Sequence, residues 1–441
     1  MNRISFKYIL GFVWMLPLFV QAQVPVLKLS DAMALTLQHN YNIQMAKNDS
    51  TSYAVDRYFM DAALLPKFNG TFNRTFSVNA QKQELANGTK RDTSGLRSNN
   101  LQAGLTMNWL LFDGMKMFIT RDKIQELEKV GGLSVKAQII QNLATLINQY
   151  YGIVRQKQLL KAIEEQISIN EERVKLADKK LSVGLGAKPE LLQAKVDLNA
   201  QQAQRQVQLT AIEQSKLQMN QLMGITDQKI YEVEEIIPIQ MDLNYGSITE
   251  NILQKNARLL LASKNIDIAK LTLKERKAEL YPTLSFNSTY NFNKLQNKAV
   301  INNFTPLYNQ TKGFNYGIGI SVPILNGFNT RRQIQQANLD VQYQELNYKN
   351  LQSQIDANLN IAYKDYELQK KLLFLEEDNI LLAKENVNIA LERYKQGVAT
   401  FLELREAQKS LELAYTRLIS ARYETKQAET TLMELNGSLL Q

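Results

Sequence analysis

Hydrophobic positions recur every three or four residues over two very long stretches, from about Lys116 to Val183 and from about Thr330 to Gln396. This spacing places apolar side chains along one face of an α-helix. At 1.5 Å per residue, each stretch predicts a helix roughly 100 Å long, packed against neighbours in a coiled-coil-like manner. Shorter periodic stretches start near Leu29 and Ile248 and predict single helices that end at Pro66 and Pro282.

Four other segments alternate apolar and polar residues with a period of two, which is typical of β-strands. The alternate positions opposite the apolar ones are polar and uncharged, and each segment is long enough to cross a bilayer as a tilted strand. Arg74 interrupts the first apolar face. The apolar positions are Phe68, Phe72, Phe76 and Val78; Leu101, Leu105, Met107, Trp109 and Leu111; Leu284, Phe286, Tyr290 and Phe292; and Phe314, Tyr316, Ile318, Ile320 and Val322.

The same alternation occurs in half-buried sheets of soluble proteins. Two features favour strands in a membrane: aromatic residues are frequent on the apolar faces, and the connections 81–98 and 295–313 are long and polar, as surface loops are. A four-stranded sheet cannot close on itself, and open edges are not tolerated in hydrocarbon. The strands therefore predict a symmetric oligomer in which copies of the chain complete one another.

The chain is an internal duplication. Asn40–Pro66 aligns with Asn256–Pro282, and Leu105–Gly114 aligns with Ile318–Gly327. The predicted organisation is a signal peptide (1–22), a first repeat (23–224), a linker (225–247) and a second repeat (248–441). Each repeat reads as helix, β-hairpin (67–112 and 283–325), long helix, glycine-containing turn near 184 or 397, and returning helix.

Residues 1–22 combine Arg3 and Lys7 with an apolar stretch and a small-residue cleavage pattern, which predicts a secretory signal. The chain has no cysteine, so it carries neither disulfides nor a lipidated cysteine. Its net charge of +9 comes from basic and acidic residues that are interspersed, as in Lys161–Lys180. This arrangement predicts solvated helix faces, and no nucleic-acid partner is expected. With His39 as the only histidine, no catalytic triad, metal site or cofactor is expected, and an enzyme is not predicted.

Both long helical runs are broken once by glycine, in the motifs SVGLGAKPELLQAK (Ser182–Lys195) and ERYKQGVATFLELREAQ (Glu392–Gln408). Gly184, Gly186 and Gly397 permit backbone with positive φ, and Pro189 suits the first turn of a returning helix. The motifs therefore predict that each helix reverses direction there.

With these motifs, the signal and the duplicated unit, the mature chain resembles the TolC-like outer-membrane efflux family. The resemblance implies a mixed α/β membrane protein that closes as a homotrimer into a 12-stranded β-barrel continued by a periplasmic α-helical barrel. It implies an outer-membrane channel-tunnel of a tripartite efflux or type I secretion system in a Gram-negative bacterium. The implied partners are a periplasmic adaptor protein, an inner-membrane pump of the RND, ABC or MFS type, and outer-membrane lipid.

The resemblance also assigns roles to residues at the two turns. Val183, Gly184, Leu185, Gly186, Gln396, Gly397, Val398 and Ala399 would be the tips that touch the adaptor. Glu190 and Tyr394 match the gate-holding acidic residue and tyrosine, and Glu403 and Glu406 match an acidic ring at the narrow end of the tunnel. An ordinary solvated helix face explains the two glutamates equally in the absence of the resemblance.

The chain departs from the family at Ala399, where a gate arginine is expected, which leaves an Arg–carboxylate lock without its cation. Lys188 is a candidate replacement. The alternative to a channel is a periplasmic helical adaptor or scaffold without a membrane barrel, in which the alternating strands pack inside a protein core.

Overall fold

The computed structural model describes residues 25–226, 231–250, 252–299 and 305–440. The predicted signal peptide lies outside these residues. The chain folds into two compact units, and each takes pieces from both halves of the sequence. Unit 1 contains the residues up to Leu35, Gln149–Pro238 and Ile380–Tyr423. Unit 2 contains Thr36–Asn148, Ile239–Asn379 and the residues from Glu424 onward.

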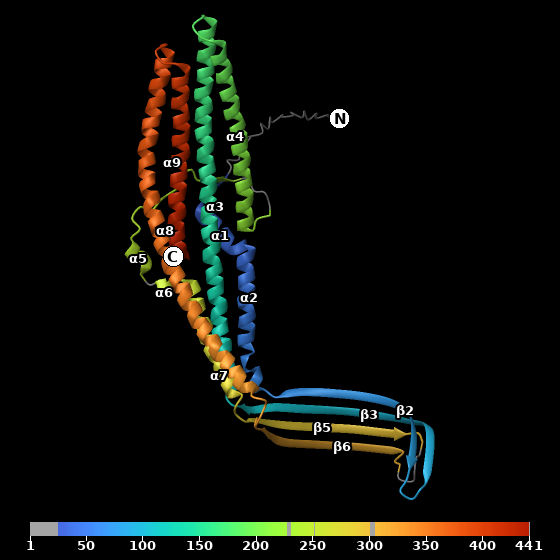
Figure 1. Ribbon diagram of the computed structural model, residues 1–441. Helices are drawn as coiled ribbons and strands as arrows, with labels where there is room; N and C mark the ends of the chain where they lie inside the picture. The colour runs from blue at the N-terminus through green and yellow to red at the C-terminus, as the bar shows by residue number, and fades with distance from the viewer. Residues whose placement is uncertain (1–24, 227–230, 251, 300–304, 441) are drawn as a thin grey trace, which may run out of the picture. The chain divides into compact units, whose positions relative to one another are not determined.

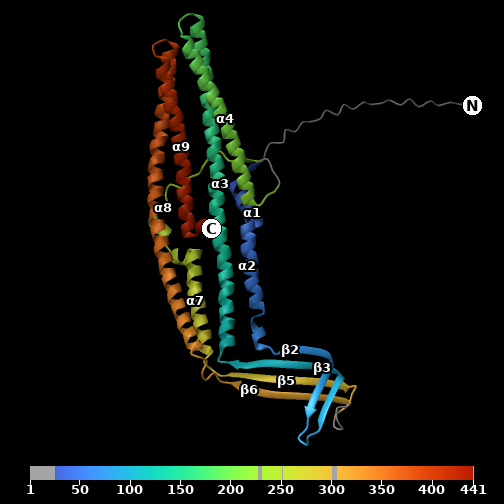
Figure 2. The ribbon, with the colours of Figure 1, turned by 45° about the vertical axis from the view of Figure 1, so that its right-hand side comes forward.

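Two helical hairpins dominate unit 1, and their turns lie at one end of it (Figures 1 and 2). The first joins α3 (Lys116–Ser182) to α4 (Lys188–Met223), and the second joins α8 (Asn329–Lys395) to α9 (Phe401–Asn436). The bounds of α3 and α8 confirm the two long helices predicted from periodicity. Each is 67 residues long because no proline and no helix-ending glycine interrupts the run.

Tyr150 anchors the end of unit 1 that lies away from the turns. This side chain is completely buried, and its hydroxyl donates to the carbonyl oxygen of Leu27 at 2.9 Å and accepts from the amide of Glu234 at 3.2 Å. Leu27 belongs to β1 (Val26–Leu27), which pairs in parallel with β4 (Glu232–Val233), and Glu234 directly follows β4. The hydroxyl therefore fastens the linker segment and the start of the described chain to α3.

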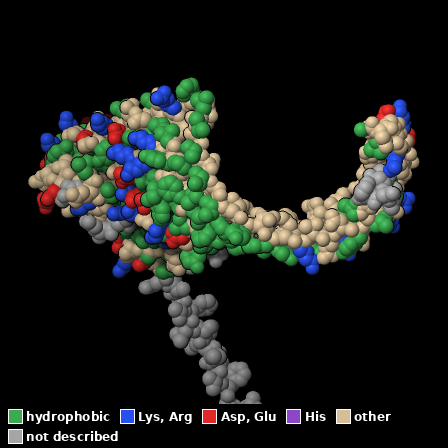
Figure 3. Space-filling model, turned by 90° about the horizontal axis from the view of Figure 1, so that it is seen from below, with side chains coloured by type: hydrophobic (Ala, Val, Ile, Leu, Met, Phe, Trp, Pro, Cys, Tyr) green, Lys and Arg blue, Asp and Glu red, His purple; other side chains and the backbone are tan. Residues whose placement is uncertain are grey.

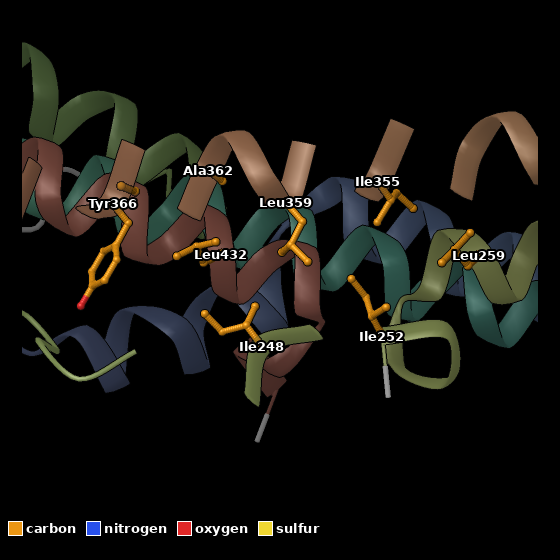
Figure 4. Packing of buried hydrophobic residues seen from close by; sticks show 9 residues of the cluster. Ile248, Ile252, Leu259, Ile355, Leu359, Ala362, Tyr366 and Leu432 are labelled. Carbon is orange, nitrogen blue, oxygen red and sulfur yellow. The ribbon is translucent and has the colours of Figure 1, made fainter. Parts of the chain in front are cut away.

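The helical part of unit 2 is built around a core from several elements (Figure 4). It comprises α2 (Tyr41–Tyr58), the 3-10 helix η1 (Met60–Leu64), α5 (Tyr245–Thr249), α6 (Ile252–Lys255), α7 (Ala257–Ala278) and the neighbouring parts of α3, α8 and α9. The buried cluster is Ile248, Ile252, Leu259, Ile355, Leu359, Ala362, Tyr366, Ala428 and Leu432. These residues recur every three or four positions along α8 and α9, as a packed helix face requires.

The single helices predicted from Leu29 and from Ile248 are wrong, because each is broken at a matched asparagine. The second is also broken after Thr249, where Glu250 has extended backbone. Helix α1 (Leu29–His39) ends before Asn40, whose side-chain oxygen accepts from the amide of Ile43 at 3.1 Å and caps α2. Asn256 does the same for α7, accepting from the amides of Arg258 and Leu259 at 3.0 and 3.1 Å. Asparagine competes for backbone hydrogen bonds and favours the cap position over a helix interior.

The four long strands form one antiparallel sheet in the order β2-β3-β5-β6, so β2 and β6 are its edges (Figure 1). Their bounds are Lys67–Glu84 (β2), Lys90–Asp113 (β3), Thr283–Asn297 (β5) and Tyr308–Ser321 (β6). The register carries apolar residues across the sheet in one row, in which Leu105 lies opposite Tyr290 and Tyr290 opposite Phe314. The predicted alternation is therefore confirmed as two faces of one sheet. Leu111 is the exception, because a register shift between Leu110 and Phe112 puts Phe112, and not Leu111, opposite Leu284.

One face of the sheet is apolar and the other is polar. Figure 3, seen from below, shows green hydrophobic and some blue basic side chains on the outer side of the curved sheet, and mostly tan surface along its hollow side. The residues that pair on the polar face include Asn73 with Gln102 and Thr106 with Thr289. The apolar face is exposed in the single chain: Phe72 and Ile318 each keep 70% of their surface accessible.

The prediction that residues 81–98 form a surface loop is wrong. Strands β2 and β3 continue as a hairpin to a turn at residues 85–89, where Gly88 adopts a φ of 82°. Paired charges hold this extension, because Lys82 lies 2.9 Å from Asp92. The connection 295–313 is likewise partly strand, since β5 runs to Asn297 and β6 starts at Tyr308. Cross-strand salt bridges let a polar sequence remain extended outside an apolar environment.

None of the helices in the described part of the chain combines the length and the apolar character needed to cross a membrane.

Candidate functional site

The first tip turn ends α3 with a left-handed glycine. Gly184 has a φ of 79°, the amide of Leu185 donates to the carbonyl oxygen of Lys180 at 2.8 Å, and the amide of Gly184 donates to that of Leu181 at 3.1 Å. These two bonds form the Schellman pattern that satisfies the last carbonyls of a helix. Pro189 lies in the first turn of α4, as predicted from the sequence.

Gly186 serves the turn differently from the prediction. Its φ lies outside the left-handed region, so conformational freedom does not explain the glycine. A Cβ atom at this position would lie 2.8 Å from the backbone nitrogen of Leu181 and 2.9 Å from Cβ of Lys180. The turn therefore needs glycine because two backbone segments approach closely.

The second tip turn repeats the first reversal with a different start to the returning helix. Gly397 has a φ of 75°, and the amides of Val398 and Gly397 donate to the carbonyl oxygens of Arg393 and Tyr394 at 2.9 and 3.1 Å. Helix α9 then begins at Phe401, directly after Thr400, whose hydroxyl oxygen lies 3.2 Å from both the amide nitrogen and the carboxylate of Glu403. Thr400 and Glu403 resemble a capping box, in which Glu403 helps to start the helix.

Each tip presents an apolar side chain to solvent. Leu185 is 83% exposed and Val398 is 65% exposed, and the two occupy matched positions one residue after the left-handed glycines. Val183 is also exposed, whereas Ala399 is buried. Large apolar side chains at the apex of each hairpin are therefore left mostly exposed in the single chain.

Tyr394 lies at the contact between the two hairpins just below the tips. The side chain is 2% exposed, and the ammonium of Lys180 lies 3.7 Å from the centre of its ring while donating to its backbone carbonyl oxygen at 2.6 Å. Burial raises the pKa of Tyr394, the negative charge of Glu190 raises it further, and Arg173 opposes them. Glu190 and Tyr394 thus lie within electrostatic reach of one another, and Lys180 joins the two hairpins there. The neighbouring Lys395 also joins them, because its ammonium lies 2.9 Å from the carboxylate of Glu172.

Below Tyr394 lies a buried polar layer that sequence reasoning missed. Arg173 is 1% exposed; its guanidinium donates to the carboxylate of Asp197 at 2.6 Å and to the side-chain oxygen of Gln408 at 2.7 Å. The same carboxylate lies 3.4 Å from Arg405 of α9. Burial lowers the pKa of Arg173 and the Asp197 charge raises it. One ion-pair network therefore connects α3, α4 and α9.

The prediction that the charges of Lys161–Lys180 lie on a solvated face is wrong for Arg173. Ala162, Gln166, Asn170, Arg173 and Ala177 are all buried and follow one another at spacings of three and four residues. Polar residues that continue an apolar stripe at core spacing were the signal in the sequence. Such residues, when paired, favour one register of a coiled coil over others.

A cavity of about 550 Å³ adjoins this network on the side of α9. Its lining includes Arg173, Asp197, Arg405, Glu406 and Lys409. The side-chain nitrogens Nε2 of Gln166 and Gln408 are buried beside it without a hydrogen-bond partner in the described chain. Glu406 thus borders the cavity, whereas Glu403 serves the start of α9, and both side chains are exposed. Within the described residues, no cluster of His, Asp or Glu side chains is arranged to hold a metal ion.

A family model described as outer membrane efflux protein matches the chain twice, over residues 33–225 and 248–438. The chain belongs to the outer membrane efflux protein family. It is 20% identical to the outer membrane efflux protein BepC of Brucella suis over 343 residues, which cover 76% of this chain and 72% of BepC. The family establishes efflux across the outer membrane as the function and disfavours the adaptor or scaffold without a barrel.

Solved structures share the fold. The outer membrane protein VceC of Vibrio cholerae matches with a TM-score of 0.75 and 17% identity, covering 93% of this chain and 96% of that one. The CmeC outer membrane channel of Campylobacter jejuni matches with a TM-score of 0.78 and 17% identity, covering 99% of this chain and 93% of that one. The two family matches coincide with the two halves that the sequence repeats.

Proposed function

We propose that three copies of the chain close into one pore, with a 12-stranded β-barrel in the outer membrane continued by a periplasmic helical barrel. The observation that carries this proposal is the sheet itself, whose edge strands β2 and β6 are unpaired within the described chain and whose apolar face is exposed. In hydrocarbon every strand edge must be paired, so neighbouring copies pair β6 of one chain with β2 of the next.

The pore serves a tripartite system that includes a periplasmic adaptor and an inner-membrane pump of the RND, ABC or MFS type. The tips Val183–Gly186 and Gln396–Ala399 dock on the adaptor. Support comes from Leu185 and Val398, which expose large apolar surfaces at the ends of rigid helical hairpins. Burying such side chains against a partner is favourable by roughly 1.5–3 kcal/mol each.

The tip half of unit 1 acts as the gate. Ala399 stands at the position where a gate arginine is expected. Its role is taken by Arg173 and Arg405, which pair with Asp197. Lys180 and Glu190 act in addition on Tyr394. Opening the tunnel separates the two hairpins and so breaks the contacts of Arg405 with Asp197, of Arg173 with Gln408 and of Lys180 with Tyr394. Glu403 and Glu406 of three chains form a ring of six carboxylates at the aperture, which favours cations.

Membrane fractionation and planar-bilayer conductance of the detergent-purified protein test the pore. We expect an outer-membrane oligomer whose conductance is small because the tips are closed. Asp197→Asn should raise the open fraction, since it removes the charge that holds both arginines. A soluble periplasmic protein without conductance would refute the channel and restore the scaffold alternative.

The docking surface is tested without straining the turns. Leu185→Ser and Val398→Ser together should weaken adaptor binding at least tenfold, measured with immobilised adaptor and purified oligomer. Val207→Ser removes an equally exposed apolar group from the body of α4 and should leave binding unchanged. Full adaptor binding by the double variant would refute docking through the tip side chains.

The carboxylate ring is tested by cation block. Glu403→Gln with Glu406→Gln should weaken block of single channels by a trivalent cation, because two charges per chain leave the aperture. Glu171→Gln with Glu213→Gln removes the same charge from exposed positions of α3 and α4 and should not alter block. Equal block in both variants would place the two glutamates outside the lumen.

A further inference from the structure

The charges of the sheet are distributed unequally between its two faces. Outside the hairpin extension, the strand segments 67–80, 96–113, 283–297 and 308–321 contain five basic residues and one acidic residue, Asp113, which lies opposite Thr283 on the polar face. The register places Lys67 on the polar face, where it lies opposite Asn108. The other four, Arg74, Arg97, Lys294 and Lys312, lie on the apolar face.

Three of these cations are neighbours across the sheet. Arg74 and Lys294 both lie opposite Leu101, one on each side, so they are two strands apart, or about 10 Å. Lys312 lies opposite Phe292, two residues before Lys294, which makes the two lysines diagonal neighbours. Arg74, Lys294 and Lys312 therefore form one patch, here called the outer basic patch.

Aromatic rings support each member of the patch. The Arg74 guanidinium lies 4.8 Å from the centre of the Phe76 ring and donates to the side-chain oxygen of Asn99 at 3.2 Å. The ammonium of Lys294 lies 5.5 Å from the Tyr308 ring, and that of Lys312 lies 5.9 Å from the Phe292 ring. Cation–π contacts leave the remaining N–H donors free to meet an anion.

The position of the outer basic patch along the membrane normal follows from the length of the strands. On β5, ten residues separate Leu284 from Lys294, which corresponds to roughly 25 Å along the membrane normal for a strand tilted by about 40°. An outer-membrane barrel has an apolar band of about that height. The patch thus lies at the end of the apolar band that is remote from the helices, where the outer leaflet has its head groups.

Unpaired cations on a lipid-facing surface are costly at the bilayer midplane and tolerable only near an interface. The nearest acidic side chains of the hairpin, Glu84 and Asp92, are engaged with Lys90 and Lys82. We infer that the outer basic patch binds the phosphate groups of a phosphorylated glycolipid in the outer leaflet. The inference rests on the proposed barrel, because the barrel turns the apolar face toward lipid.

The experiment uses the purified full-length oligomer in a zwitterionic detergent and native mass spectrometry. The probes are a diphosphorylated lipid A, the same lipid after enzymatic removal of its phosphates, and inorganic phosphate. We expect the wild-type protein to retain the diphosphorylated lipid at least tenfold more tightly than the dephosphorylated one, and inorganic phosphate to compete only weakly. Equal retention of both lipids overturns the inference, and so does full competition by inorganic phosphate, which would make the patch a simple ion site.

Matched variants locate the effect. The triple variant R74Q/K294Q/K312Q should lose the preference for phosphorylated lipid, whereas K67Q/K349Q/K371Q, with the same loss of charge at positions outside the patch, should keep it. The charge-conserving R74K/K294R/K312R should also keep it, which shows that the surface folds without its native side chains. Preference retained by the first variant overturns the inference.

Conductance separates this inference from the proposed function. In a bilayer of zwitterionic lipid alone, the wild-type protein and R74Q/K294Q/K312Q should form pores of equal conductance, because the patch faces away from the lumen. Pores without lipid preference overturn the inference alone. Absence of pores from the wild-type protein overturns the proposed function.

Discussion

The two tip turns reverse the chain in the same way but are completed by different residues. Gly184 and Gly397 are matched in position, in φ and in the pair of backbone hydrogen bonds that close the helix. Two residues later the first turn has Gly186, where backbone segments nearly touch, and the second has the buried Ala399. The backbone requirement for a left-handed residue has been kept in both copies, whereas the side chains around it have diverged.

The side chains of the helices behind the tips differ even more between the two hairpins. Arg173 and Asp197 of the first hairpin form a buried ion pair, and their counterparts in the second hairpin are Asn386 and Ser410. Leu181 of the first hairpin corresponds to Tyr394 of the second. A duplicated scaffold therefore holds an asymmetric contact, in which one hairpin supplies the buried cation and the other supplies the buried phenol. Substitutions at matched positions of the two hairpins show which of these differences affect stability.

The largest effect is expected at Arg173. Arg173→Ala leaves Asp197 and Gln408 without their buried partner, and the free energy of unfolding should fall by roughly 3 kcal/mol. The matched Asn386→Ala changes an exposed side chain and should fall within about 0.5 kcal/mol of wild type. Denaturant unfolding followed by far-ultraviolet circular dichroism measures both.

A second substitution separates charge burial from packing. Arg173→Met combined with Asp197→Leu removes both ions and should restore much of the stability, because buried pairs contribute little beyond their desolvation cost. Similar losses in the single and the double variant would mean that the ion pair and the hydrogen bond to Gln408, which Met and Leu cannot replace, stabilise this layer.

The next largest effect is expected at Gly186. Gly186→Ala drives a Cβ atom into backbone, and the strain should cost about 2 kcal/mol and loosen the first turn. The matched Ala399→Gly removes one buried methyl group and should cost about 1 kcal/mol. Hydrogen exchange at the Leu185 and Val398 amides reports each turn separately. If Gly186→Ala accelerates exchange at the Leu185 amide only as much as Ala399→Gly accelerates it at the Val398 amide, the two turns have the same steric requirement.

Much of this architecture could be predicted from the sequence because it depends on periodic patterns. The spacing of apolar residues defines α3 and α8 to within one residue, and alternation defines the two faces of the sheet. The breaks at Asn40 and Asn256 were missed because a single capping side chain decides them. The extension of β2 and β3 was missed because it depends on cross-strand pairs such as Lys82 with Asp92.

The polar layer of the tip hairpins required tertiary information. Arg173 occurs in a charged segment, and only its spacing from Ala162 and Ala177 distinguishes it from its solvated neighbours. Its partners Asp197 and Gln408 are far away in the sequence, on other helices. Such a contact is set by how helices pack, and no pattern within a single helix specifies it.

Alkaline pH should affect the two hairpins differently. The pKa of Tyr394 is raised by burial and by Glu190, so its stabilising contribution is complete below the ordinary tyrosine pKa near 10 and is lost as pH rises through the folded-state value. Above pH 10 the Val398 amide should exchange faster than its intrinsic pH dependence explains, and the Leu185 amide less so. Tyr394→Phe should abolish this difference. A difference that persists in Tyr394→Phe would assign the transition to another buried tyrosine, such as Tyr150, whose pKa burial raises to about 12.

The smallest effect is expected for substitutions at the residues that precede α4 and α9. They test whether the two helix starts can be exchanged. Thr400 caps α9, and Thr400→Ala should cost about 1 kcal/mol. The matched residue before α4 is Ala187, which has extended backbone but no side-chain cap, and Glu190 already occupies the position of Glu403. Ala187→Thr should therefore complete a capping box and stabilise the first hairpin by about 0.5 kcal/mol. Slower exchange at the Glu190 amide would confirm the new cap. Unchanged exchange there, with Thr400→Ala still destabilising, would show that the close approach at Gly186 prevents the first turn from accepting the cap geometry of the second.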